Sequence, residues 1–264
     1  MSRTTALRRS PIAGTALLIV ALLVAGFVYT ALAGFSGTAR AADSGATSSQ
    51  IQTGKQLYLE TCSSCHGLAA EGTMNGPTLI GVGAAAVDFQ VGTGRMPAAA
   101  PAVQIPQKRV QFNDEQIAAL AAYVASLSPG PAIPTAEDLN YSNADLALGG
   151  ELFRTNCAQC HNFAAQGGAL TNGKYAPNLT NVSPKHIWEA MLTGPQNMPV
   201  FGNETMRPQD KQAIIKYIRS LNAEPAPGGA SLGKVGPVTE GLVGWLVGLG
   251  ALIGAAVWIG VKAS

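Results

Sequence analysis

The sequence predicts an all-α protein in which two small domains of similar sequence follow one another between two apolar segments. Three observations predict this class: an internal repeat, helical spacing of apolar residues at the end of each repeat copy, and two long runs without a charged residue. The uncharged runs cover residues 10–39 and 241–261. With 264 residues and 47% hydrophobic content, the chain has enough apolar sequence for folded cores and membrane segments.

The two repeat copies share short patterns in the same order along the chain. Gly54 and Gly149 each stand eight residues before the first cysteine of their copy. The other matched pairs are Leu57-Tyr58 with Leu152-Phe153, Ala69-Ala70 with Ala164-Ala165, Pro77-Thr-Leu79 with Pro177-Asn-Leu179, and Thr93-Gly94 with Thr193-Gly194. Each copy closes on a helical pattern, which in the first is formed by Ile117, Leu120, Ala121, Val124 and Leu127. The chain therefore contains two copies of one unit of about 80 residues.

The N-terminal run is predicted to be either a retained membrane anchor or a cleaved signal. Its apolar stretch is longer than the roughly 7 to 15 residues of a signal-peptide core, which favours an anchor. Against this, Ala39-Arg40-Ala41 has the small-x-small pattern that a signal peptidase accepts. Both alternatives predict export of the following domains.

The C-terminal run is predicted to be a transmembrane helix, because residues 241–261 at about 1.5 Å per residue cover a hydrocarbon core of about 30 Å. Basic residues flank both apolar runs, as expected of cytoplasmic ends. Between Ala42 and Gly236 there are 12 Lys and Arg against 14 Asp and Glu, so the exported part is not basic and no nucleic-acid partner is expected.

All four cysteines fall into two copies of C-x-x-C-H, the attachment signature of c-type haem. Each motif sets two thiols one turn apart for thioether bonds to the haem vinyl groups, and the adjacent histidine meets the iron as proximal ligand. The residues are Cys62, Cys65 and His66 in the first copy and Cys157, Cys160 and His161 in the second.

Zinc sites, thiol redox motifs and disulfides also use paired cysteines. The chain has only three histidines, so one at the same position of each motif is improbable by chance, and six ligands exceed the four of a structural zinc site. The sequence therefore predicts two covalently bound haem c groups.

Met96 and Met198, each followed by proline, are the candidate sixth ligands of the two irons. They alone recur at matched repeat positions, whereas the other methionines are expected to be core or surface residues. His186 aligns with Ala86 and is expected to be a surface or satisfied structural histidine.

These features predict two tandem cytochrome c-type haem domains, a C-terminal transmembrane helix and an N-terminal hydrophobic segment. The predicted boundaries are 1–45 for the N-terminal segment, 46–128 and 141–222 for the two domains, 129–140 and 223–240 for Pro- and Gly-containing linkers, and 241–262 for the helix.

The two C-x-x-C-H units, the paired Met-Pro loops and the C-terminal anchor resemble the dihaem cytochrome c subunit of the actinobacterial cytochrome bcc complex, a menaquinol/ubiquinol to cytochrome c reductase. The resemblance implies that cytochrome b, the Rieske iron-sulfur subunit and a terminal cytochrome c oxidase are partners. It also implies that electrons pass from the Rieske protein to the oxidase in haem domains on the outer side of the cell membrane. The six residues of the two C-x-x-C-H motifs, together with Met96 and Met198, would hold the two haems. The chain would be an electron-transfer subunit with no substrate site of its own.

Three other functions remain open from the residues. The chain could be a dihaem cytochrome serving another membrane dehydrogenase or oxidase. A dihaem peroxidase or a gas sensor would need an open sixth position on an iron, which a methionine in both copies does not favour.

Overall fold

The computed structural model describes residues 11–35, 46–223 and 237–263. The chain divides into two compact units, Met1–Ala46 and Thr47–Ser264, and each is described by itself. Among its described residues the first unit has one helix, α2 (Pro11–Phe35), whose sequence has no charged residue. The sequence Ala39-Arg40-Ala41 and most of the linker 223–240 lie outside the described residues.

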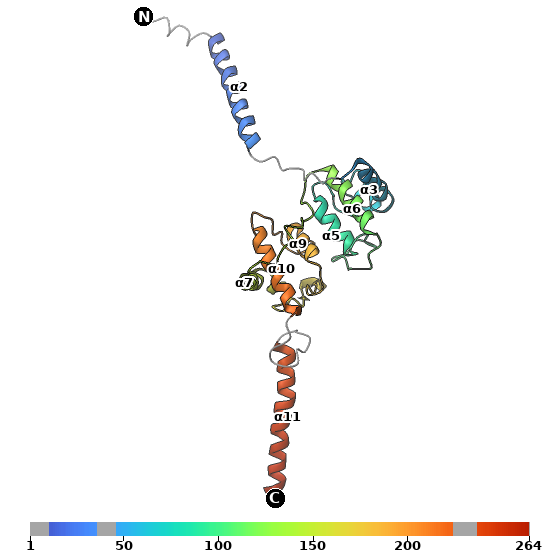
Figure 1. Cartoon of the computed structure of the whole chain (residues 1–264), viewed down its shortest axis with the longest axis vertical. Coiled ribbons are helices and arrows are strands. Elements are labelled where there is room, and N and C mark those ends of the chain that lie inside the picture. Colours follow the sequence, from blue (N-terminus) through green and yellow to red (C-terminus); the bar gives the residue numbers. More distant parts are fainter. Residues whose placement is uncertain (1–10, 36–45, 224–236, 264) are drawn as a thin grey trace, which may run out of the picture. The chain divides into compact units, whose positions relative to one another are not determined.

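In the second unit, the first repeat copy folds as four helices around one apolar core (Figure 1). These are α3 (Ser48–Thr61), α4 (Ser63–His66), α5 (Gly83–Gly92) and α6 (Asp114–Leu127). Helix α6 begins with a capping box, in which Asn113 accepts from the backbone of Gln116 while the Gln116 side chain accepts from the backbone of Asn113.

The second copy repeats the order of helices and adds a small ribbon. Its elements are α7 (Leu146–Asn156), α8 (Ala158–His161), β1 (Gly168–Ala169), the 3-10 turn η1 (Thr171–Gly173), β2 (Tyr175–Ala176), α9 (Pro184–Thr193) and α10 (Pro208–Ala223). The two strands pair antiparallel, with Gly168 opposite Ala176. The all-α prediction is confirmed for the main architecture; the departures among the described residues are this short ribbon and an isolated β-bridge between Thr73 and Gly76 in the first domain.

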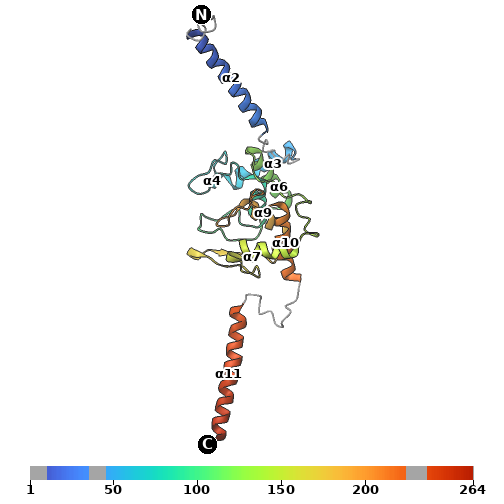
Figure 2. The same cartoon turned by 90° about the vertical axis from the view of Figure 1, so that its left-hand side faces the viewer.

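A close helix crossing precedes each cysteine motif. A Cβ atom built on Gly54 of α3 would lie 1.9 Å from the carbonyl oxygen of Ala119 in α6. A Cβ atom on Gly149 of α7 would lie 2.0 Å from the carbonyl oxygen of Ala213 in α10. Figure 2 shows α7 and α10 lying against each other. The matched glycines of the sequence are therefore the points at which the first and last helix of each copy touch.

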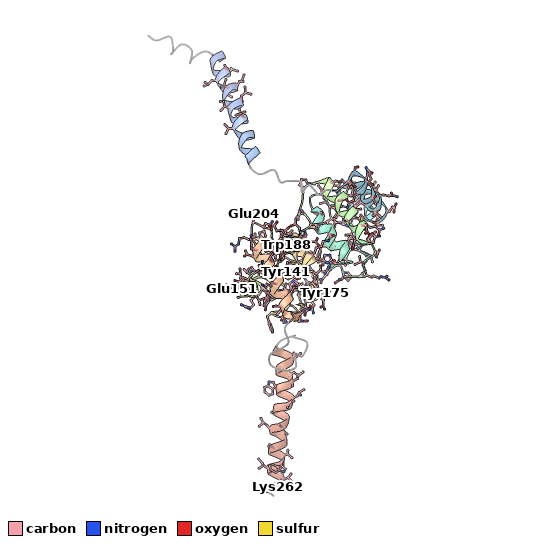
Figure 3. The ribbon with its side chains drawn as sticks, in the orientation of Figure 1. Tyr141, Glu151, Tyr175, Trp188, Glu204 and Lys262 are labelled. Atoms are coloured by element: carbon pink, nitrogen blue, oxygen red, sulfur yellow. The ribbon has the colours of Figure 1, made fainter. Side chains whose placement is uncertain are left out.

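Each domain has its own core, and the two cores are built alike. Tyr58 and Phe153, which the repeat aligns, are both completely buried. The Tyr58 ring lies 5.3 Å from the ring of Tyr123, and the Phe153 ring lies 5.4 Å from that of Tyr217. Trp188 of α9 is 2% exposed in the second core and is labelled in Figure 3.

The apolar C-terminal run forms α11 (Pro237–Ala263). Within it, Gly241–Ala263 is long and apolar enough to cross a membrane, with a mean hydropathy of 2.2. Among the described residues it is the one helix that meets this test, since the segment Gly14–Val28 of α2 is shorter. The predicted C-terminal helix is thus present and is long and apolar enough to cross a membrane, while α2 contains the shorter apolar segment Gly14–Val28.

Candidate haem sites

The two cysteine motifs adopt the same backbone turn at the end of a helix. In the first, the backbone nitrogens of Cys65 and His66 both donate to the carbonyl of Cys62, at 3.1 and 3.0 Å. In the second, Cys160 and His161 donate to Cys157 at 3.2 and 2.9 Å. Helices α3 and α7 deliver the first cysteine of each motif, and the one-turn helices α4 and α8 carry the second cysteine and the histidine.

Both motif histidines are buried, and each is oriented by a proline carbonyl. The Nδ1 atom of His66 lies 2.7 Å from the carbonyl oxygen of Pro77, and that of His161 lies 3.0 Å from the carbonyl oxygen of Pro177. A carbonyl can only accept, so Nδ1 carries the proton and Nε2 keeps its lone pair for a metal. Burial lowers the pKa of His161 and outweighs the opposing bond to Pro177, which keeps this imidazole neutral.

The loops that carry these prolines have matching hydrogen bonds. The backbone nitrogen of Leu79 donates to Ala70, and that of Leu179 donates to Ala165, both at 2.8 Å. Ala70 and Ala165 share a left-handed backbone, with φ of 63° and 58°. The residues that match in the repeat therefore occupy equivalent positions in the two domains. In each domain the loop that they form holds the proline carbonyl against the histidine.

The structure places the two candidate methionines differently from the other methionines of the described residues. Met96 packs against the core cluster that Cys62 also contacts, and Met198 packs against the cluster that Cys157 contacts. Met191 and Met206 are core residues that are 2% and 6% exposed, as expected for fillers. Met74 is fully exposed.

The methionine loops of the two copies are built differently. The backbone nitrogen of Met96 donates to Gln90 at 2.9 Å, and Lys108 donates through Nζ to the carbonyl of Pro97 at 2.6 Å. The backbone nitrogen of Met198 donates to Pro195 at 3.1 Å, after a left-handed helix end at Gly194. The loops that connect α5 to Met96 and α9 to Met198 are therefore held by different hydrogen bonds in the two copies.

The four cysteines form no disulfide, and the first of each motif is a poor thiolate. Burial raises the pKa of Cys62, and it raises that of Cys157 to about 12. Zinc binding and thiol exchange both require the thiolate. A neutral buried sulfur suits a thioether, so the environment of these two sulfurs fits covalent haem attachment.

The sequence did not reveal which hydroxyl groups support the motif loops. In the first domain, Tyr58 of α3 donates through its hydroxyl to the carbonyl of Gly67 at 2.7 Å. In the second domain, phenylalanine replaces this tyrosine, and Tyr217 of α10 donates to the carbonyl of Phe163 at 3.3 Å. The substitution at Phe153 was visible in the repeat alignment, but the compensating contact depends on packing between helices.

These two domains, each with a buried histidine after a pair of cysteines and a methionine packed on the same core, define a c-type cytochrome. Residues 51–128 match the family model described as cytochrome c, and residues 144–218 match that of cytochrome c oxidase, cbb3-type, subunit III.

Curated relatives extend the match to nearly the whole chain. The chain is 44% identical over 266 residues to the cytochrome bc1 complex cytochrome c subunit of Mycobacterium tuberculosis, covering 98% of this chain and 94% of that one. Proteins of the same name match from Mycobacterium leprae, at 45% identity over 94% of this chain and 87% of the relative, and from Corynebacterium efficiens, at 43% over 96% and 90%. The chain belongs to the family of cytochrome c subunits of the cytochrome bc1 complex.

The family and the two matched domains establish covalently bound haem c, one group in each domain. They also establish an electron-transfer role, with α11 as a membrane anchor. Both sites fit the haem, since each offers a neutral buried imidazole and two thiols on one turn.

Proposed function

We propose that this chain is the electron carrier of a quinol to cytochrome c reductase complex, and that it connects the Rieske iron-sulfur subunit to a terminal cytochrome c oxidase. Its relatives carry the name of a cytochrome c subunit of the bc1 complex, which supports cytochrome b and the Rieske protein as neighbours. The observation that carries the proposal is that both domains have the same arrangement of histidine, proline carbonyl and methionine. Two haem sites of the same kind suit a chain that relays single electrons. They suit less well an enzyme in which one haem is catalytic and the other only supplies electrons.

The ligands proposed for the first haem are Cys62 and Cys65 as thioethers with His66 and Met96 on the iron. The second haem has Cys157 and Cys160 with His161 and Met198. When bound, each haem supplies an iron that alternates between ferric and ferrous states. The protein holds each imidazole in one tautomer through a proline carbonyl, supplies a thioether that favours the ferrous state, and excludes water with its core.

We further propose that electrons enter at the first domain and leave from the second. The second domain matches a family model named for an oxidase subunit, whereas the first matches cytochrome c in general. Basic residues flank the apolar runs, with Lys262 in the last turn of α11, and this charge pattern supports haem domains on the outer side of the cell membrane.

The methionine assignment is tested with Met96→Ala and Met198→Ala in the full chain, using Met74→Ala as the exposed control. Each of the first two variants should bind carbon monoxide at about one of the two reduced haems, because an open iron position accepts it, and should lower the potential of that haem. The parent and the control should bind almost none. Carbon monoxide binding by the parent, or unchanged spectra in both methionine variants, would reject the ligand set.

The direction of flow is tested in the purified complex with variants that keep one haem. Removing the first site through Cys62→Ala and Cys65→Ala should stop reduction of the second haem by quinol. Removing the second site through Cys157→Ala and Cys160→Ala should leave the first haem reducible but block oxygen consumption. The reverse pattern contradicts the proposed order, and a purified complex without an oxidase contradicts the proposed acceptor.

A further inference from the structure

The equivalent helices of the two copies, α5 and α9, contact each other and bring the two haem domains together. The Nζ atom of Lys185 in α9 lies 2.7 Å from Oδ2 of Asp88 in α5. The Phe89 ring stands edge-on to the imidazole of His186, with centroids 6.1 Å apart. The contact between α5 and α9 therefore combines an ion pair with an aromatic contact.

Three potential metal ligands converge at this contact. Asp88, His186 and Glu189 each direct one ligand atom to a common place, and these atoms lie within 4.8 Å of one another. The separation of His186 Nε2 and Asp88 Oδ2 is 3.8 Å. Two ligands bound at about 2.0 to 2.1 Å to one zinc ion lie roughly 3.4 Å apart at a tetrahedral angle. The His186–Asp88 separation exceeds this value by about 0.4 Å, and the other separations, which lie within 4.8 Å, would close by up to about 1.4 Å when an ion binds.

Glu189 provides the strongest evidence for a cation site at this contact. Its side chain is completely buried, and as an ionised carboxylate it has no hydrogen-bond donor at either oxygen; a hydrogen bond to the Asp88 carboxyl group needs a proton on Glu189. Asp88 is 5% exposed, and its Oδ2 has the Lys185 ion pair but no hydrogen bond of acceptable geometry. Burying two ionised carboxylates beside one ammonium group is costly, so Glu189 either holds a proton or faces a further cation.

The titration behaviour of the cluster agrees with this geometry. Burial, and then the charge of Asp88, raises the pKa of Glu189 to about 9. Burial also lowers the pKa of His186, and this effect exceeds the opposing attraction of Asp88. The neighbouring cations Lys185 and Arg95 lower it further. The imidazole is therefore neutral at physiological pH, with a lone pair available for a cation.

On the side of α5, a glycine lies next to the imidazole nitrogen of His186. A Cβ atom built on Gly92, the last residue of α5, would lie 3.1 Å from His186 Nε2. The glycine leaves this side of Nε2 without a side chain. Lys185 is 39% exposed, so its ammonium group can move into solvent when another cation approaches Asp88.

We propose that Asp88, His186 and Glu189 form a binding site for a divalent transition-metal ion of the zinc type, which links the two haem domains. One imidazole nitrogen and two carboxylate oxygens suit such an ion better than calcium or magnesium, which prefer oxygen ligands alone. A proton shared between Asp88 and Glu189 is the competing occupant. It would satisfy one oxygen of Glu189 but leave the other oxygen and the imidazole unused, whereas a metal ion engages all three side chains.

The test measures zinc against iron in the purified full chain with both haems attached. The protein is stripped with a chelator, incubated with zinc ions alone, freed of excess zinc and analysed by plasma mass spectrometry. The two covalently bound haem irons serve as an internal count of chains. We expect about one zinc for every two irons, and X-ray absorption at the zinc edge should show one nitrogen and two or more oxygen neighbours at about 2.0 to 2.2 Å.

Glu189→Gln and His186→Gln should each lower zinc affinity by at least about tenfold, as loss of one ligand predicts. Gly92→Ala should also weaken binding, because its methyl group faces Nε2 while all three ligands remain. Glu151→Gln, an exposed change on α7, is the matched control and should keep full zinc. An unchanged haem circular dichroism spectrum shows that a variant is folded.

Two results would overturn the proposal. If the parent chain retains no zinc, a proton or Lys185 alone satisfies the cluster. If zinc is retained equally by the parent and by both ligand variants, or if the absorption spectrum of the parent shows sulfur neighbours, the ion is bound elsewhere. The spectrum of the parent decides this even if a ligand variant fails to fold.

Discussion

Gly149→Ala tests the helix crossing that positions the second cysteine motif. The added methyl group would lie 2.0 Å from the backbone oxygen of Ala213, about 1.5 Å closer than the optimum near 3.5 Å. The contact is with backbone, so α7 and α10 must move apart.

The expected loss of stability follows from two opposing effects. Overpacking of this kind costs about 1–3 kcal/mol, and a backbone collision belongs at the upper end. Alanine recovers about 1 kcal/mol through its better helix propensity. The net destabilisation is about 2 kcal/mol, which for a domain of about 80 residues lowers Tm by roughly 8–16 °C.

The assay is thermal unfolding of the full chain in detergent, followed by haem circular dichroism and by tryptophan fluorescence, to which Trp188 of the second core contributes together with Trp245 and Trp258 of α11. Gly150→Ala is the matched control in the same helix, since its Cβ would lie 3.1 Å from side-chain atoms of Arg154 and Tyr217, which can move. This control should melt at or slightly above the parent temperature. If Gly149→Ala melts within about 3 °C of the parent, the close crossing is wrong.

Three further predictions concern other parts of the chain. Asn113→Ala removes the capping box of α6 and should lower the stability of the first domain by about 1 kcal/mol, measured by denaturant titration, while Gln111→Ala outside the box should have little effect. The hydrogen bond from Arg207 holds the pKa of Asp210 below its ordinary value, so the stability that this pair gives is present at neutral pH and lost as pH falls through the lowered pKa. Asp210→Asn should therefore reduce Tm at pH 7 and change it little near pH 2, and an equal change at both would contradict this assignment. Ending the chain after residue 236 removes α11 and should release the haem domains from membranes if the N-terminal segment is cleaved; domains that stay in the membrane pellet would indicate that α2 is retained.

The haem chemistry could be predicted from sequence because it depends on local spacing. Cys62, Cys65 and His66 share a single turn, so their relation does not depend on the rest of the fold. The internal repeat then extended the prediction from the first copy to the second. It paired Gly54 with Gly149, and the structure shows both glycines at the same kind of helix crossing.

Contacts between distant segments could not be predicted in the same way. The carbonyls of Pro77 and Pro177 orient the histidines, yet a carbonyl group is present at every residue and leaves no signal in the side chains. The sequence showed the two prolines only as aligned positions of the repeat, without indicating the role of their carbonyl groups.

His186 shows the limit most clearly. The sequence favoured a surface or satisfied structural histidine, because its counterpart in the first copy is Ala86. The structure places it beside Asp88, nearly one hundred positions away, where the two copies meet. A contact between copies has no counterpart within either copy, so the repeat could not indicate it.

The central claim is that this chain relays electrons through two haems that are both closed to outside ligands. It is tested most directly by mixing the purified complex with quinol under carbon monoxide, with the oxidase inhibited, and counting the c-type haem that becomes reduced. Our account predicts two reduced haems per chain with spectra unaffected by carbon monoxide. A haem that stays oxidised, or one that binds carbon monoxide, would contradict it.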